Sequence, residues 1–244
     1  MREFSLWVMV ICLAQPVLAE DYRLLTAEIP PFTSMEEGYK GLFLDVIEEL
    51  MQRTGDKVEL VYQPWKRSQA DVAMASADKK MLIAPLTRVL EREAKYDWIL
   101  QIYQYSMVFV ALDPRVEINN MEALKQVPVC VIRESPGQYK LRRLNFANIV
   151  DRGDESQCYK MLESGRVKAV FSHGVIMSRW NYTRQGGEAN KLIFGARFPA
   201  IPIFMSSSKG VINDESKARF HIAFDEMVVD GTYRQILDKY EKRF

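Results

Sequence analysis

The first third of the chain alternates between strand-like and helix-like patterns, and this order constrains the fold most strongly. The segment after Gly41 repeats apolar residues at helical spacing and ends at Gly55, a residue typical of helix C-termini. A second helix is expected at about 66–75. Because strand–helix–strand connections place successive strands parallel, the order predicts a parallel sheet with helices on its faces. The apolar runs that predict its strands are 22–27, 58–62 and 81–84.

The rest of the chain predicts a second unit of the same kind. A return strand at 201–207 and two closing helices follow it, the first capped by Asp214 and the second starting at Gly231. The repetition lies in the order of the elements, not in the sequence, so we expect an α/β fold with two similar units. The strands expected in the second unit are 105–112, 127–132, 148–150 and 167–171, and the helices are 139–144 and 156–163.

The amino terminus indicates export. An almost unbroken apolar run, Phe4–Leu13, follows Arg2, and small residues precede a cleavage point after Ala19. This pattern is typical of a secretory signal peptide, here residues 1–19, and the run is too short to span a bilayer comfortably. An uncleaved anchor is the alternative. Removing 19 of the 244 residues leaves 225, enough for one large domain or two lobes of roughly 100 residues each.

The charge balance and the cysteine and histidine content limit which partners, disulfides and metal sites are expected. The 33 basic and 32 acidic residues give a formal net charge of +1 without a basic stripe, so nucleic acid is not an expected partner. Cys130 and Cys158 remain in the exported chain and suggest a disulfide, with two separate buried thiols as the alternative. His173 and His221 are far apart in the sequence and no C-x-x-C occurs, so neither a metal nor another cofactor is expected.

The segment Pro85–Ile99 follows a buried strand-like run and carries Thr87, Arg88 and Arg92. A strand end followed by a helix start presents free backbone N–H groups that attract anions. An arginine there adds a planar fork of donors that fits a carboxylate. The segment therefore predicts a site for a small carboxylate. The alternative is a solvated helix whose charged side chains pair along its surface.

Several short motifs occur along the chain in a specific order and spacing. They are P-P-F at 30–32, G-L-F-L-D-V at 41–46, P-W at 64–65, L-T-R-V-L-E-R at 86–92 with a trailing Y-D-W, G-R-V-K-A at 165–169 and D-G-T-Y-R-Q-I-L-D-K-Y at 230–240. Together they resemble the periplasmic solute-binding proteins of polar amino-acid uptake systems, the family 3 extracellular solute-binding proteins. The resemblance covers nearly all of the exported chain, and its last motif is the most specific.

The resemblance implies a two-lobed, type II periplasmic-binding-protein fold. The first lobe would comprise residues 20–105 and 204–244, and the second residues 113–198. Hinge segments at 106–112 and 199–203 would join them. The ligand would lie in the cleft of a monomer, and the lobes would close over it.

The same resemblance suggests ligand contacts in the first lobe. Arg92, by its spacing after Thr87 and before Trp98, would clamp the ligand carboxylate. Thr87 would donate its hydroxyl to the same group, or would simply cap a helix. Arg88 is either a second anion contact or a surface residue.

Further contacts are expected from aromatic residues and from a loop of the second lobe. Phe32 and Trp65 would form flat walls of the site, with ordinary core packing as the alternative. Glu28 would face a ligand amine or positive side chain, or else solvent. In the loop R-E-S-P-G at 133–137, Ser135 and Gly137 would contact the carboxylate, although this sequence departs from the family's usual G-T or G-S and a simple turn is the alternative.

One departure bears directly on the ligand. In amino-acid binders of the family, an aspartate shortly after a V-D-A strand receives the α-ammonium. Here Lys168 replaces the acid of V-D-A, and the later position falls at His173. A neutral histidine accepts one hydrogen bond but does not pair with an ammonium as an aspartate does. The ligand therefore either lacks an α-amine or uses Glu28 instead, unless His173 is purely structural.

The expected function is capture of a small carboxylate-bearing solute in the periplasm, with an amino acid as one candidate. The solute would pass to an inner-membrane ABC permease, without catalysis. Two alternatives stay open. One is an enzyme on the same fold, such as a dehydratase of small cyclic acids that uses Glu28 and His173 as acid and base. The other is a ligand-sensing protein that docks on a separate membrane receptor.

Overall fold

The computed structural model describes residues 19–241. The signal peptide expected at 1–19 therefore lies outside the described residues, except for its last position. Within 19–241, none of the helices combines the length and apolar character that a bilayer crossing requires.

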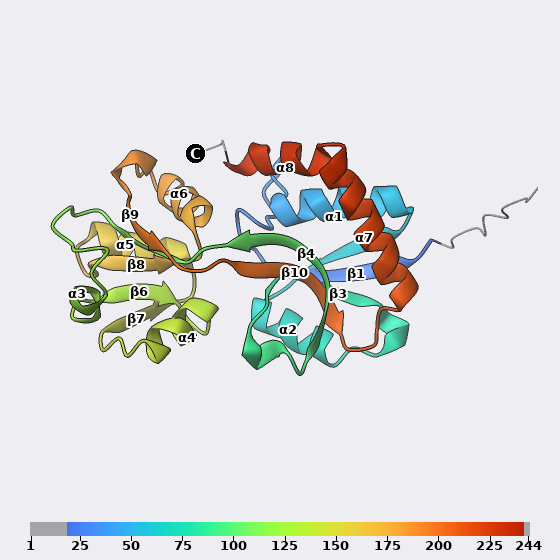
Figure 1. The fold of residues 1–244 in the computed structure, drawn as a ribbon, viewed down its shortest axis with the longest axis horizontal. Helices are drawn as coiled ribbons and strands as arrows, with labels where there is room; N and C mark the ends of the chain where they lie inside the picture. The colour runs from blue at the N-terminus through green and yellow to red at the C-terminus, as the bar shows by residue number, and fades with distance from the viewer. Residues whose placement is uncertain (1–18, 242–244) are drawn as a thin grey trace, which may run out of the picture.

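Within the described residues, the chain forms two five-stranded sheets that lie side by side along the long axis of the molecule (Figure 1). The first has the order β2-β1-β3-β10-β4. Its strands are β1 (Asp21–Thr26), β2 (Lys57–Tyr62), β3 (Met81–Thr87), β4 (Tyr96–Tyr105) and β10 (Ile201–Ser208). Strand β1 pairs in parallel with β2 and β3, as the alternation of elements predicts, whereas β10 is antiparallel to β3 and β4.

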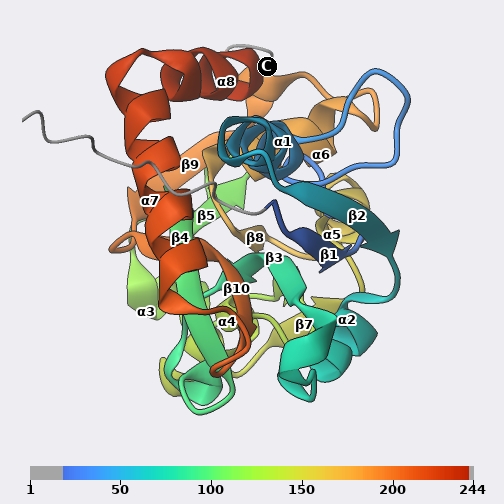
Figure 2. The same ribbon diagram turned by 90° about the vertical axis from the view of Figure 1, so that its right-hand side faces the viewer.

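Helices cover both faces of this sheet. Figures 1 and 2 show α1 and α8 on one side and α2 on the other. We call this sheet and its helices the first lobe. The helices are α1 (Leu42–Thr54), α2 (Trp65–Ala73), α7 (Asp214–Val229) and α8 (Thr232–Glu241), with short 3-10 turns η1 (Ala77–Lys79) and η2 (Leu90–Arg92).

The second sheet has the order β7-β6-β8-β5-β9 and, with its helices, forms the second lobe. Strand β6 is parallel to β7 and β8, and β5 is antiparallel to β8 and β9. The strands are β5 (Val108–Ala111), β6 (Val129–Ile132), β7 (Ile149–Arg152), β8 (Ala169–Ser172) and β9 (Ile193–Arg197). The helices are α3 (Met121–Lys125), α4 (Pro136–Arg143), α5 (Glu155–Glu163), α6 (Val175–Thr183) and the 3-10 turn η3 (Ala189–Lys191).

The chain passes between the sheets at 106–107 and again at 198–200. The single strand predicted over 105–112 is therefore wrong, because Tyr105 ends β4 in one sheet and Val108 begins β5 in the other. The lobe and hinge limits drawn from the sequence stay a prediction, and the structure places β5 and the whole of β10 within sheets.

The helix expected within Pro85–Ile99 is also wrong. Pro85 lies inside β3, the short turn η2 follows, and β4 then pairs along its length with β10. The cap of α7 is Asn213 rather than Asp214, because the Asn213 side chain accepts a hydrogen bond from Ser216 N. The elements that the sequence patterns did not predict are α3, β4, α6 and β9.

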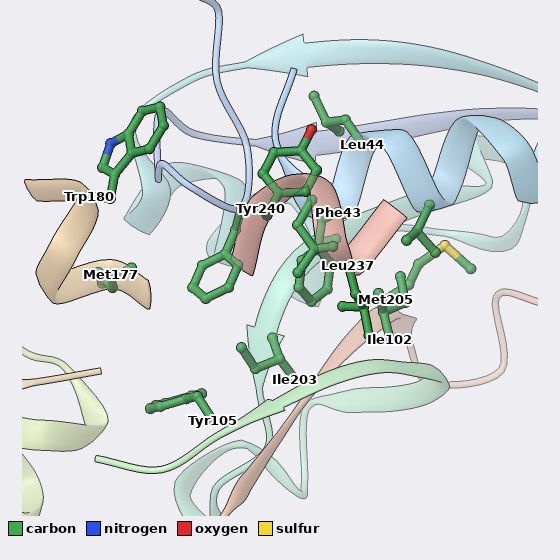
Figure 3. Packing of buried hydrophobic residues seen from close by; sticks show 14 of the residues in the cluster. Phe43, Leu44, Ile102, Tyr105, Met177, Trp180, Ile203, Met205, Leu237 and Tyr240 are labelled. Atoms are coloured by element: carbon green, nitrogen blue, oxygen red, sulfur yellow. The ribbon is translucent and has the colours of Figure 1, made fainter. Parts of the chain in front are cut away.

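The largest cluster of buried apolar side chains includes residues of both lobes. Figure 3 shows members of this cluster, with Met177 and Trp180 on α6 and Phe43 and Tyr240 from the first lobe. In the second lobe a disulfide joins Cys130 of β6 to Cys158 of α5, which confirms the pair expected from the sequence.

Candidate ligand-binding site

A cavity of about 350 Å³ lies between the lobes, in the size range of small-molecule sites. It is lined from the first lobe by residues at or just beyond the carboxyl ends of β1, β3 and β4. The second lobe contributes residues that follow β6, β7 and β8. Ligands of open α/β sheets bind at this edge, because the loops there leave a crevice. Seven of the residues predicted for the site line this cavity: Glu28, Phe32, Trp65, Thr87, Arg92, Ser135 and His173.

Thr87 and Arg92 lie together at the end of β3. Thr87 is the last residue of the strand, and Arg92 Nη1 donates a hydrogen bond to its carbonyl oxygen at 2.9 Å. The helix-cap interpretation of Thr87 is wrong, because no helix begins there. Burial lowers the pKa of the Arg92 guanidinium. No carboxylate among the described residues forms an ion pair with Arg92.

Arg88 lies apart from the cavity. Its guanidinium forms an exposed ion pair with Glu93 at 2.8 Å and lies 5.4 Å from the centre of the Trp98 ring. The structure thus agrees with the surface interpretation of Arg88 and not with a second anion contact.

The start of α1 positions Phe32. The backbone N–H groups of Leu42 and Phe43, free at the helix start, donate to the carbonyl oxygens of Pro31 and Phe32 at 2.9 and 2.8 Å. Gly41 permits this approach, because a Cβ there would lie 2.5 Å from Phe32 O and its φ is +101°. The Phe32 ring also packs edge-on against Phe43, so it combines core packing with a place in the cavity wall. Trp65, half-buried, begins α2 and also lines the cavity.

Glu28 is at the cavity, but its carboxylate is already engaged. Ser34 Oγ donates to Oε1 at 2.7 Å and Met35 N donates to Oε2 at 2.7 Å. The side chain is exposed and closes the turn that precedes α1. A ligand amine would have to compete with these donors.

In the second lobe, Ser135 starts α4. Its hydroxyl accepts from Gln138 N at 3.2 Å and donates to Ile132 O at 2.7 Å, so it caps the helix while lining the cavity. Gly137 does not line the cavity. A Cβ there would lie 3.0 Å from Val131 Cγ2, so its place in the structure is close packing of α4 on β6, and its predicted ligand contact is not supported.

His173 follows β8 and is 9% exposed. Its ring lies 5.6 Å from the ring of Tyr105, the last residue of β4. Its Nδ1 lies 3.6 Å from Oε2 of Glu155, a residue that the sequence analysis did not consider. Glu155 is 3% exposed and lines the cavity. An acid in the first turn of a helix has the pattern of an ordinary capping residue, and this explains the omission.

The family model of bacterial extracellular solute-binding proteins, family 3, matches residues 24–243. The chain belongs to this family. Family 3 is a family of binding proteins, extracellular by its description, and the predicted two-lobed α/β fold is confirmed. Comparison with curated proteins gives no match.

Solved structures of this family's fold cover most of the chain. An ancestral arginine-binding protein bound to arginine is 23% identical, with a TM-score of 0.75 over 91% of this chain and 98% of that one. An ancestral amino acid-binding protein that is a precursor of cyclohexadienyl dehydratase is 19% identical, with a TM-score of 0.75 over 90% and 94%. The substrate binding protein of an amino acid ABC transporter is 17% identical, with a TM-score of 0.72 over 92% and 100%. At these identities the likeness establishes the fold alone.

Proposed function

We propose that this protein captures a small carboxylate-bearing solute in the periplasm and delivers it to an inner-membrane ABC permease. The observation that carries the proposal is the Arg92 guanidinium, which lines the interlobe cavity without an acidic partner among the described residues. A desolvated guanidinium is costly unless an anion pairs with it, and its planar fork suits a carboxylate. The ligand therefore supplies the missing charge.

Capture follows from contacts with both lobes. The carboxylate meets Arg92 and Thr87 on the first lobe, while Ser135 and His173 face it from the second. A ligand that touches both lobes binds the closed arrangement more tightly than the open one, so it shifts the population toward closure. Phe32 and Trp65 bound the apolar part of the solute. No bond is made or broken.

Similarity to other proteins of known fold supports a proposal for the solute and for the partner. The family and the neighbours named above include proteins that bind amino acids, and one serves an amino acid ABC transporter. An amino acid is therefore the leading candidate for the solute, and an ABC permease for the partner.

Replacing Arg92 with alanine tests the site. We expect Arg92→Ala to weaken carboxylate binding by roughly 2–5 kcal/mol, because it removes a desolvated charged partner. Isothermal titration calorimetry on a panel of amino acids and other small carboxylates measures the loss. Arg88→Ala is the matched control and should leave affinity unchanged, since Arg88 pairs on the surface. Equal binding by Arg92→Ala and wild type would contradict the site assignment.

A dehydratase acting on small cyclic acids is the second candidate, and the His173–Glu155 pair favours it. A carboxylate 3.6 Å from a ring nitrogen can orient a histidine as a general base. Incubation with small cyclic hydroxy acids, followed by mass spectrometry of the products, separates the two functions. If product accumulates with wild-type protein but not with His173→Ala, the function is catalysis rather than solute capture.

A further inference from the structure

The cavity holds a second charge without a full partner, opposite in sign to the first. Glu155 lies in the wall formed by the second lobe, and its side chain is only 2% exposed. In the described part of the chain, no lysine or arginine pairs with it, and its nearest basic group is the imidazole of His173. A buried carboxylate is normally compensated by a cation, as is a buried guanidinium. Arg92 and Glu155 thus place a positive and a negative side chain, each without an oppositely charged lysine, arginine or carboxylate partner among the described residues, in the wall of one cavity.

The two oxygens of Glu155 differ in their surroundings. Ser172 Oγ donates to Oε1 at 2.5 Å, and the hydroxyl of Tyr159 donates to the same atom at 3.4 Å. Oε2 receives only a long bond from the backbone N of His173, at 3.5 Å. An ionised carboxylate accepts about four hydrogen bonds, so Oε2 keeps acceptor capacity. Its open position is the one nearest His173, which itself lines the cavity.

The other acids along the cavity are committed elsewhere. Glu28 is exposed, and its oxygens accept from the turn at 34–35. Glu134 pairs with Lys66. Asp154 caps α5 through its side chain. Among the described residues that line the cavity, Glu155 is therefore the buried acid with an open oxygen.

We propose that Glu155 receives the cationic group of the ligand, so that the site selects carboxylates that also carry an amine. This inference rests on the proposed function and adds to it the residue that sets ligand class. It resolves the departure at position 173: the negative charge comes from the first turn of α5, which follows β7, rather than from the end of β8. The His173 ring neighbours both the Glu155 carboxylate, at 3.6 Å from Nδ1, and the Tyr105 ring, at 5.6 Å between centroids.

The ligand side of the test uses wild-type protein. Calorimetry compares each amino acid with the same molecule lacking the amine, for example L-leucine with 4-methylpentanoate, L-glutamate with glutarate and L-phenylalanine with 3-phenylpropanoate. The amine-bearing member of the pair that binds best should bind at least roughly 30-fold more tightly, because its loss leaves a buried carboxylate unpaired. Equal affinity for the two members would overturn the inference and leave the Arg92 site intact.

The protein side uses Glu155→Gln, which preserves the shape of the side chain and removes its charge. The variant should lose roughly 30-fold or more in affinity for the amine-bearing member while its affinity for the deaminated member stays unchanged. Glu226→Gln, an exposed site on α7, is the matched control and should behave as wild type. Equal weakening of both members by Glu155→Gln would indicate a structural role and overturn the inference.

Two further outcomes keep the test decisive. Circular dichroism and thermal unfolding report whether Glu155→Gln folds, and if it does not, the wild-type comparison of ligand pairs decides alone. Binding of neither member of any pair, or binding insensitive to Arg92→Ala, would overturn the proposed function and this inference with it. If Arg92→Ala still weakens binding but the amine makes no difference to affinity, the inference fails while the proposed function stands.

Discussion

Two arginines four positions apart in the sequence have different surroundings, and the difference shows what decides a residue's role. Arg88 lies on the surface, where Glu93 and the Trp98 ring occupy its guanidinium. Arg92 turns back toward Thr87 and lines the cavity. Both carry the same charge and the same donors. Compensation by neighbours, not residue type, therefore decides which of the two can take an anion.

Neighbouring groups also compensate the charge of Asp230, which lies at the corner between α7 and α8. The backbone N–H of Thr232, its side chain and the Arg53 guanidinium at 2.7 Å lower the pKa of Asp230 to about 2. Because the folded-state pKa lies below the usual 3.8, the ionised form stabilises the fold above about pH 4, and this contribution is lost as the pH falls through 2. Thermal unfolding should show Asp230→Asn less stable than wild type at neutral pH, with the difference vanishing near pH 2. Asp225→Asn, at an exposed site on α7, is the matched control and should unfold like wild type at neutral pH.

At the scale of elements, the cavity depends on how β6 and α5 are held together. Ser135 follows β6, and Glu155 is the first residue of α5. The Cys130–Cys158 disulfide joins these two elements across 28 positions of sequence. It lies in a fully buried cluster of the second lobe. The disulfide therefore contributes to the stability of this lobe and to the placement of its site residues.

Reducing this disulfide should lower the free energy of unfolding by about 3–4 kcal/mol, as expected for a loop of this length in the chain-entropy model. Urea titration followed by circular dichroism, with and without reductant, measures the change. The double variant Cys130→Ser/Cys158→Ser should match the reduced wild type and should not respond to reductant. Identical midpoints for oxidised and reduced wild type would contradict the expectation.

At the scale of the whole molecule, contacts between the lobes surround the cleft. Among the described residues, ion pairs join the lobes at Lys66–Glu134, at Glu91–Arg143 (3.7 Å) and at Glu36–Arg184 (2.5 Å). The rings of Tyr39 and Trp180 stack between the lobes with centroids 4.3 Å apart. These contacts stabilise the arrangement of the lobes in the structure, and if that arrangement binds the ligand as proposed, they contribute to its affinity.

Ionic strength should therefore tune ligand affinity through the interlobe ion pairs. Exposed pairs contribute about 0–1 kcal/mol each and are screened by salt, so raising the salt should weaken wild-type binding by up to roughly tenfold. The triple variant Glu36→Gln/Glu91→Gln/Glu134→Gln should bind more weakly at low salt and show a shallower salt dependence. Calorimetry across a salt series measures both. Parallel salt dependences for wild type and variant would assign the effect to the ligand's charge instead.

The sequence by itself determined the local elements and the type of molecule. Apolar periodicity between Gly41 and Gly55 predicted α1 to within a residue, because helical spacing is encoded by residues three and four apart. The alternation of strands and helices predicted the parallel β1–β2 and β1–β3 pairs. The ordered motifs identified the family that the whole-chain match establishes. Each of these signals is short-range or is carried by a contiguous motif.

The tertiary structure alone decided what depends on residues far apart in the chain. Strand β4 forms because β10, about a hundred positions later, pairs with it, and no local pattern carries that partner. The crossing at 106–107 splits one apolar run between two sheets. The open oxygen of Glu155 depends on β8 and its following loop, which lie 17 and 18 positions further along the chain, and the cavity that it lines needs both lobes. Burial and charge compensation depend on the assembled surroundings, so the sequence indicated the charged residues and the fold decided which of them line the cavity.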